Sequence, residues 1–198
     1  IECVGMAKCT DALIQKVMET LALLAHETQT TFPFAQSPFW KNLMGRAVRI
    51  SDHVPAYQKV TLSKTMQVID KHLGKLTLPW ILRLGDVTRW NIAVDGRSNR
   101  LKVIDLEYAR EHWLVGWDIF HFMRSSGLSY SEPMNSYFQK IGIEPEQINK
   151  LYLAYLVDLF TEWYESWTEV RKRPHAIAQL EFRCLVKDIY REMIQLGG

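Results

Sequence analysis

Residues 82–123 read LRLGDVTRWNIAVDGRSNRLKVIDLEYAREHWLVGWDIFHFM, and this stretch decides the fold. A short apolar run over residues 80–84 comes first and is typical of a strand. Gly85 then lets the chain turn sharply, so we expect Asp86 to project from a loop.

The next residues predict a β-hairpin. Asn91 begins an apolar run over residues 92–94, a cluster of turn residues follows at 95–99, and a second run covers residues 101–105. A hairpin of this length returns the end of its second strand to the start of its first. We therefore expect Asp105 to lie close to Asn91 and to the Asp86 loop.

These three polar side chains suit phosphoryl transfer from a nucleotide. That reaction needs a carboxylate to orient and deprotonate the acceptor hydroxyl, and oxygen ligands to hold Mg²⁺ against the phosphates. Asp86 could supply the base, and Asn91 with Asp105 could supply the ligands. The alternative is that Asp86 and Asn91 are loop caps and that Asp105 is a turn residue at a strand end.

The stretch resembles the catalytic core of the aminoglycoside phosphotransferase and choline kinase-like enzymes, which are relatives of the protein kinases. The family's Asp-x₄-Asn loop is similar to Asp86 and Asn91, and its hydrophobic-Ile-Asp-x-Glu segment is similar to residues 103–107, VIDLE. The likeness continues through residues 116–122, GWDIFHF. An Asp-x₄-Asn pair is common by chance, whereas these elements in this order form a much more specific pattern.

The resemblance implies roles for further residues. It makes Asp118 a buried structural support of the catalytic loop, at the start of a helix. Arg89 could offset charge on a transferred phosphate or be a surface arginine, and Glu107 could support the metal site or face solvent. One departure is Leu84, because the family usually has a histidine at this place, two residues before the catalytic aspartate, where it mostly braces the loop.

The resemblance also implies a fold, α+β and mainly α: a protein kinase-like C-terminal lobe, helical with a small catalytic hairpin. Kinases of this type bind the nucleotide between this lobe and a β-rich N-terminal lobe with a Gly-rich loop and a strand lysine. Residues 1–80 contain no such features. We therefore expect residues 1–198 to be a single C-terminal-lobe domain, with the N-terminal lobe upstream in the natural protein or lost.

Apolar periodicity predicts helices around the catalytic region at 80–124. Residues 31–40, TFPFAQSPFW, break this pattern with two prolines and four aromatic residues, so we expect a surface loop with its aromatic side chains turned inward. The predicted helices cover residues 12–28, with Thr10 or Asp11 as N-cap, 58–73, 117–126, 145–169 and 174–196.

In the resembling enzymes the acceptor lies between the catalytic loop and the C-terminal helices, here residues 145–196. Asp158, Glu162 and Glu165 fall on one stripe of the helix predicted at 145–169. This stripe could bind a cationic acceptor such as an aminosugar or a quaternary amine. The simpler interpretation is a solvated helix face.

Composition limits the function classes. The chain has 198 residues, 47% of them hydrophobic, and a net charge of +2, which gives no electrostatic case for binding nucleic acid. No apolar stretch is long enough to span a membrane. Its three cysteines form no metal-binding spacing and fit a reducing cytoplasm.

The leading hypothesis is the C-terminal lobe of an ATP-dependent phosphotransferase with Mg²⁺ as cofactor, inactive as the isolated chain. Its acceptor would be a small molecule with a hydroxyl group: an aminoglycoside, a sugar or a choline-like amine. The sequence does not choose among these acceptors, between ATP and GTP, or among oligomeric states. The alternative is a non-catalytic binding or regulatory module of the same fold, and a weaker one is an unrelated helical domain.

Overall fold

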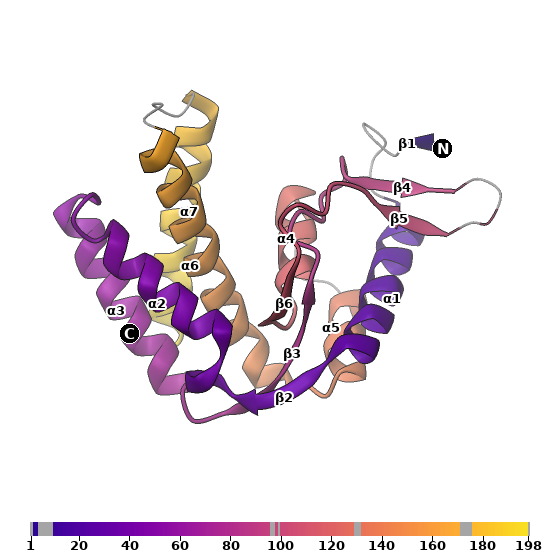
Figure 1. Cartoon of the computed structure of the whole chain (residues 1–198), viewed down its shortest axis with the longest axis horizontal. Coiled ribbons are helices and arrows are strands. Elements are labelled where there is room, and N and C mark those ends of the chain that lie inside the picture. Colours follow the sequence, from indigo (N-terminus) through magenta and orange to yellow (C-terminus); the bar gives the residue numbers. More distant parts are fainter. Residues whose placement is uncertain are drawn as a thin grey trace. The chain divides into compact units, whose positions relative to one another are not determined.

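The computed structural model describes residues 2–3, 10–95, 98, 100–128, 132–170 and 176–197. These residues form an α+β structure, mainly helical, with two small antiparallel sheets (Figure 1). The predicted fold class is therefore confirmed at this level. Within the described ranges, no helix combines the length and apolar character that crossing a membrane requires.

The chain divides into two compact units. Unit 1 comprises Ile1–Thr31 and Pro79–Ile148, and unit 2 comprises Phe32–Leu78 and Asn149–Gly198. The chain leaves unit 1 within the strand β2 (Thr30–Pro33), returns within the strand β3 (Thr77–Arg83) and enters unit 2 again within the helix α6 (Pro145–Val170). These crossings between the two units lie inside regular elements, so no Pro- or Gly-rich linker marks them in the sequence. For this reason the sequence had predicted a single domain.

Unit 1 contains the predicted hairpin. The elements are β1 (Glu2–Cys3), α1 (Asp11–Thr28), most of β3, β4 (Ile92–Val94), β5 (Leu101–Val103), β6 (Arg110–Leu114), α4 (Trp117–Ser125) and α5 (Glu132–Lys140). One sheet has the strand order β1-β4-β5, and the other has β2-β3-β6. β4 and β5 are antiparallel, with Ile92 opposite Val103, as the turn residues between them predicted.

The helix α1 confirms the prediction for residues 12–28. Thr10 is its N-cap, and the Thr10 hydroxyl accepts a hydrogen bond from the Leu13 amide at 3.3 Å. Its buried face includes Val17, Leu21 and Ala25, and the helix packs against α5, as Figure 1 also shows. Near its C-terminal end, the Thr28 hydroxyl accepts a hydrogen bond from the Leu82 amide of β3 at 3.1 Å.

Unit 2 consists mainly of helices. It holds the 3₁₀ helix η1 (Phe34–Gln36), α2 (Pro38–Ile50), α3 (Ala56–Leu73), most of α6 (Pro145–Val170) and α7 (Ala176–Gln195). The predicted helices at 58–73, 145–169 and 174–196 correspond to α3, α6 and α7, and that at 117–126 to α4. Pro174, the expected first-turn residue of the last helix, lies outside the described residues.

The prediction of a surface loop over residues 31–40 was wrong. This segment contains part of β2, then η1 and the start of α2. Ser37 caps α2, because its hydroxyl accepts a hydrogen bond from the Trp40 amide at 2.9 Å, and Pro38 occupies the first helical position. The serine–proline pair is thus a helix start. The expected inward direction of the aromatic side chains is confirmed, since Phe34, Phe39 and Trp40 are buried.

Candidate functional site

The candidate site begins where β3 ends. Gly85 has φ +99°, and a Cβ atom built there would lie 2.5 Å from the Cβ of Tyr108. Glycine is therefore required for the turn and for this close approach. The approach brings the segment that follows β5 against the loop that carries Asp86, within one unit of the chain.

The carboxylate of Asp118 holds the backbone of this loop. Its Oδ2 accepts a hydrogen bond from the Leu84 amide at 2.8 Å, and its Oδ1 accepts one from the Gly85 amide at 2.9 Å. Burial raises the pKa of Asp118, while these two amides and the charges of Arg83 and His121 act in the opposite direction. A buried side chain at the start of α4 thus fixes the two residues that precede Asp86.

Two side chains contact the carboxylate of Asp86. Asn91 Nδ2 donates to Asp86 Oδ2 at 2.7 Å and to the Asp86 carbonyl oxygen at 3.2 Å. His121 Nε2 lies 3.3 Å from Asp86 Oδ1. Asp86 keeps 32% of its side chain exposed, whereas His121 keeps 13%. The carboxylate is therefore held on both oxygens and still reaches solvent.

Asn91 and Asp105 are neighbours, as the hairpin predicted. The β4–β5 pairing extends past the strands, because the Ile104 amide donates to the Asn91 carbonyl oxygen at 2.8 Å. Asp105, the next residue, has φ +64°, a left-handed conformation that aspartate tolerates better than most residues. This backbone turn ends the strand at Val103, two residues earlier than predicted, and leaves the Asp105 side chain exposed.

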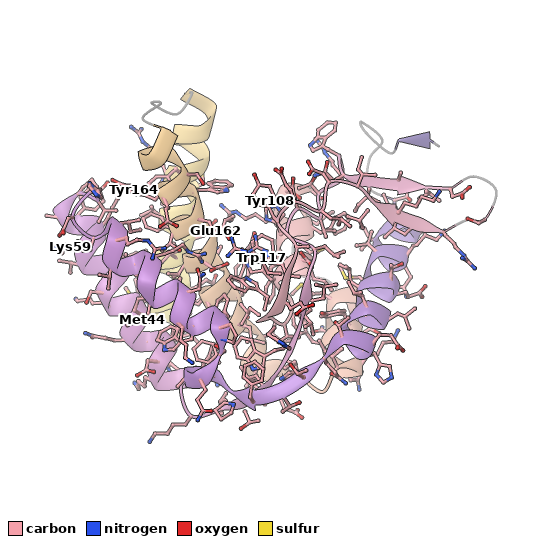
Figure 2. The ribbon with its side chains drawn as sticks, in the orientation of Figure 1. Met44, Lys59, Tyr108, Trp117, Glu162 and Tyr164 are labelled. Atoms are coloured by element: carbon pink, nitrogen blue, oxygen red, sulfur yellow. The ribbon has the colours of Figure 1, made fainter. Side chains whose placement is uncertain are left out.

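Tyr108, which Figure 2 labels, is affected by three carboxylates of the same unit. A side-chain hydrogen bond with Glu107 and the charge of Glu107 raise the pKa of Tyr108, and burial, Asp105 and Asp86 raise it further. The carboxylates of Glu107, Asp105 and Asp86 therefore all raise the pKa of the same phenol.

Arg89 lies in the same loop. Its guanidinium is 4.4 Å from the centroid of the Trp90 ring, and Trp90 is half-exposed. The Arg89 Nε is a buried donor with no hydrogen-bond partner in the part of the chain that the structure describes. An anion beside this loop would satisfy that donor.

The donor set suits Mg²⁺ with a phosphate ligand. Asn91 turns its Nδ2 to a carboxylate, so its carbonyl Oδ1 is directed away from Asp86. Together with the exposed Asp105 carboxylate, this gives oxygen ligands of the kind that Mg²⁺ uses alongside water and phosphates. Within the described residues, no group of three His, Cys, Asp or Glu side chains could hold a metal ion by itself.

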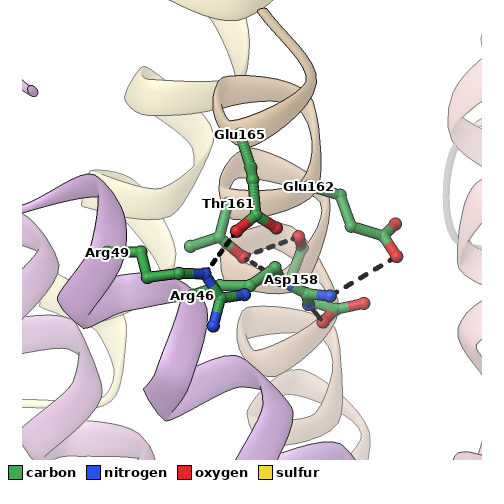
Figure 3. A network of polar contacts seen from close by, with 6 residues as sticks. All are labelled: Arg46, Arg49, Asp158, Thr161, Glu162 and Glu165. Atoms are coloured by element: carbon green, nitrogen blue, oxygen red, sulfur yellow. Dashed lines mark hydrogen bonds and ion pairs between the residues drawn. The ribbon is translucent and has the colours of Figure 1, made fainter. Parts of the chain in front are cut away.

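The carboxylate stripe of α6 belongs to unit 2, where it pairs with arginines of α2 (Figure 3). Arg46 contacts Asp158 through its Nη2 and donates from Nε to the Thr161 hydroxyl at 3.1 Å. Glu162 lies 3.6 Å from Arg46 Nη1, and Arg49 Nε donates to Glu165 at 2.6 Å.

This pairing corrects the predicted substrate face. Arg46 is 2% exposed and Asp158 is 0% exposed, so Asp158 neither lies on a solvated face nor faces an acceptor. The cations that these carboxylates face are arginines of the chain itself, because α2 is a helix rather than the end of a surface loop. Glu162 and Glu165 are only partly buried, and a contact of either with an acceptor stays a prediction.

Unit 2 also has an open groove of about 480 Å³ between α2 and α3. Its apolar lining includes Trp40, Met44, Val48 and Leu62, and Lys59 lies at its edge (Figure 2). It is separate in sequence from the Asp86 loop.

The chain matches no known family model, and no curated protein sequence matches it. The resemblance to the phosphotransferases therefore stays a prediction from the sequence motifs.

Sequence reasoning missed two of the side chains in these networks. His121 stands three residues after Asp118 and therefore on the same side of α4. That spacing was a usable signal. Arg46 gave none, since its partner Asp158 is 112 residues away in the sequence.

Proposed function

We propose that this chain is the C-terminal catalytic lobe of an ATP-dependent phosphotransferase that phosphorylates a hydroxyl group of a small molecule. The observation that carries the proposal is the support of Asp86: Asp118 holds the backbone before it, and Asn91 and His121 hold its carboxylate. An ordinary surface loop needs no such support. A general base needs it, because proton transfer requires a fixed geometry.

In this reaction Asp86 accepts the proton of the acceptor hydroxyl as the new bond between oxygen and phosphorus forms and the bond to the nucleoside diphosphate breaks. Asn91 Oδ1 and Asp105 would hold Mg²⁺, which would supply neutralisation of charge on the nucleotide phosphates. Arg89 places positive charge where the transferred group gains negative charge. A β-rich segment that covers the nucleotide is expected upstream in the natural protein.

The test is Mg²⁺-dependent nucleoside diphosphate release by the longest natural product of this reading frame, with ATP or GTP. Aminoglycosides, sugars and choline-like amines are supplied separately as acceptors, and phosphorylated products are identified by mass. The Asp86→Ala variant should lower kcat by about 10²- to 10⁴-fold, the range that a general base contributes. Because Asp86 is partly exposed, its loss should change the unfolding free energy little.

Asp95→Ala is the matched control. Asp95 follows β4 in the same hairpin and pairs with Lys102 at 3.4 Å, so its removal should leave turnover unchanged. Equal turnover of the Asp86→Ala and Asp95→Ala proteins would refute the assignment of the base. A folded natural protein that binds nucleotide and transfers phosphate to none of these acceptors would instead support the non-catalytic module.

A further inference from the structure

We infer that His121 is a positioning residue for Asp86: it fixes the rotation of the carboxylate and does not itself react. This role depends on the proposed phosphotransfer, and it specifies which part of the fold aims the base. The evidence is the contact of His121 with Asp86, the packing of the imidazole ring and the contacts that α4 makes with the loop.

The first step concerns the two oxygens of Asp86. The bond between Cβ and Cγ of an aspartate rotates over a broad range, because the terminal torsion has no sharp staggered minima. The two oxygens turn together about this bond, so the contact of Asn91 with Oδ2 at 2.7 Å restrains the rotation through one oxygen. His121 Nε2, 3.3 Å from Oδ1, restrains the same rotation through the second oxygen when Nε2 carries a proton, since an ionised carboxylate only accepts hydrogen bonds.

The imidazole ring is itself fixed. It stacks on the indole of Trp117, with ring centroids 4.8 Å apart and ring planes at 23°. Trp117 is buried and also lies under the Arg83 guanidinium, at 3.4 Å from its centroid. Because the His121 ring is already held in place, its contact with Asp86 costs little further conformational entropy.

One helix therefore makes both contacts with the loop. Asp118 of α4 binds the amides of Leu84 and Gly85, and His121, one turn later, binds the carboxylate of Asp86. The start of α4 is fixed at Gly116, which has φ +82° and leaves no room for a Cβ beside the Phe138 ring. Within the loop, residue 84 cannot donate a hydrogen bond to the Asp86 carboxylate from its side chain, because the leucine side chain has no hydrogen-bonding group.

Three substitutions separate positioning from packing. His121→Gln places an amide nitrogen near the position of Nε2, His121→Asn carries the same amide one bond shorter, and His121→Phe keeps a ring that can stack on Trp117. If His121 positions Asp86, the His121→Gln variant should retain function, and the His121→Asn and His121→Phe variants should lose it. A purely structural role predicts that Phe is the best replacement and that Gln and Asn are equally poor.

The first readout needs no nucleotide. The side-chain amide of Asn91 donates to Asp86, so its NMR resonances in the full natural protein report where that carboxylate lies. We expect these resonances to move in the Asn and Phe variants and to stay near the wild-type position in Gln. The backbone amides of Leu84 and Gly85, which Asp118 holds, should keep their hydrogen-exchange rates in all three and serve as the control.

The second readout is catalytic. A misplaced base should lower kcat by about 10- to 100-fold in the Asn and Phe variants, with the KM for nucleotide almost unchanged. If the His121→Phe variant does not fold, the comparison of His121→Gln with His121→Asn still tests whether His121 positions Asp86. Unmoved Asn91 resonances in the Asn variant, or full turnover of the Phe variant, would overturn the inference.

The two readouts keep this inference distinct from the proposed function. If the wild-type protein has no turnover but the Asn91 resonances respond as expected, phosphotransfer is refuted and the contact that holds Asp86 stands. If turnover is normal in the wild type and equally reduced in the Gln, Asn and Phe variants, phosphotransfer stands and positioning by the Nε2 donor is refuted.

Discussion

Asp118 of unit 1 and Asp158 of unit 2 are both buried carboxylates, yet their partners differ in kind. Asp118 is held mainly by two backbone amides of a loop, whereas Asp158 is held by the guanidinium of Arg46. Amides carry only partial charge, and an arginine carries a full one. The comparison teaches that Asp118 fixes the path of the loop that carries Asp86, while Asp158 joins two helices, α2 and α6.

The largest effect on stability should follow from Arg46→Met. This change removes the guanidinium that contacts the buried carboxylate of Asp158, and such a loss costs about 3–5 kcal/mol in comparable cases. Chemical denaturation would measure the loss. The double variant Arg46→Met/Asp158→Leu should recover most of it, because an apolar pair of similar volume needs no compensating charge. No recovery would mean that Asp158 has other essential contacts.

Asp118→Asn should have a smaller effect on stability and a distinct effect on the loop. An asparagine can accept through one atom only, so either the Leu84 or the Gly85 amide loses its partner, at a cost of about 1–3 kcal/mol. The exchange of one of these amides should accelerate. Unchanged exchange at both positions would show that the Asp118 carboxylate does not hold the loop.

The stability of the protein should also depend on pH through Asp118. Since burial raises the pKa of Asp118 above its ordinary value, the folded state binds its proton more tightly than the unfolded state does. This stabilising contribution is complete below the ordinary aspartate pKa and is lost as the pH rises through the folded-state value. The advantage of the wild type over Asp118→Asn should therefore shrink with rising pH in that window. An advantage that grows with pH would mean that the amides outweigh burial.

The smallest effect should come from Arg49→Met. The pair of Arg49 with Glu165 is in the same network as Arg46, but Arg49 is 59% exposed. Solvent screens such a pair, so its loss should cost less than about 1 kcal/mol. A loss as large as that of Arg46→Met would show that the network acts as one unit rather than through its buried member.

Local patterns predicted the elements of the chain well. Thr10 marked the start of α1, the turn residues after Asp95 marked the hairpin, and the apolar spacing marked α3 and α6. The failure at residues 31–40 was also local, because two prolines were taken as evidence against a helix when one of them starts α2. These signals depend on neighbours in the chain and can be read from it.

The sequence by itself determined the hairpin that brings Asn91 and Asp105 together, since strand pairing across a short turn leaves little choice. It also placed Asp86 in a loop after a glycine. Only the tertiary structure decided the partners of Asp86 and Asp158. His121 and Arg46 contact them across 35 and 112 residues of chain, and such contacts form only when distant segments of the chain pack together.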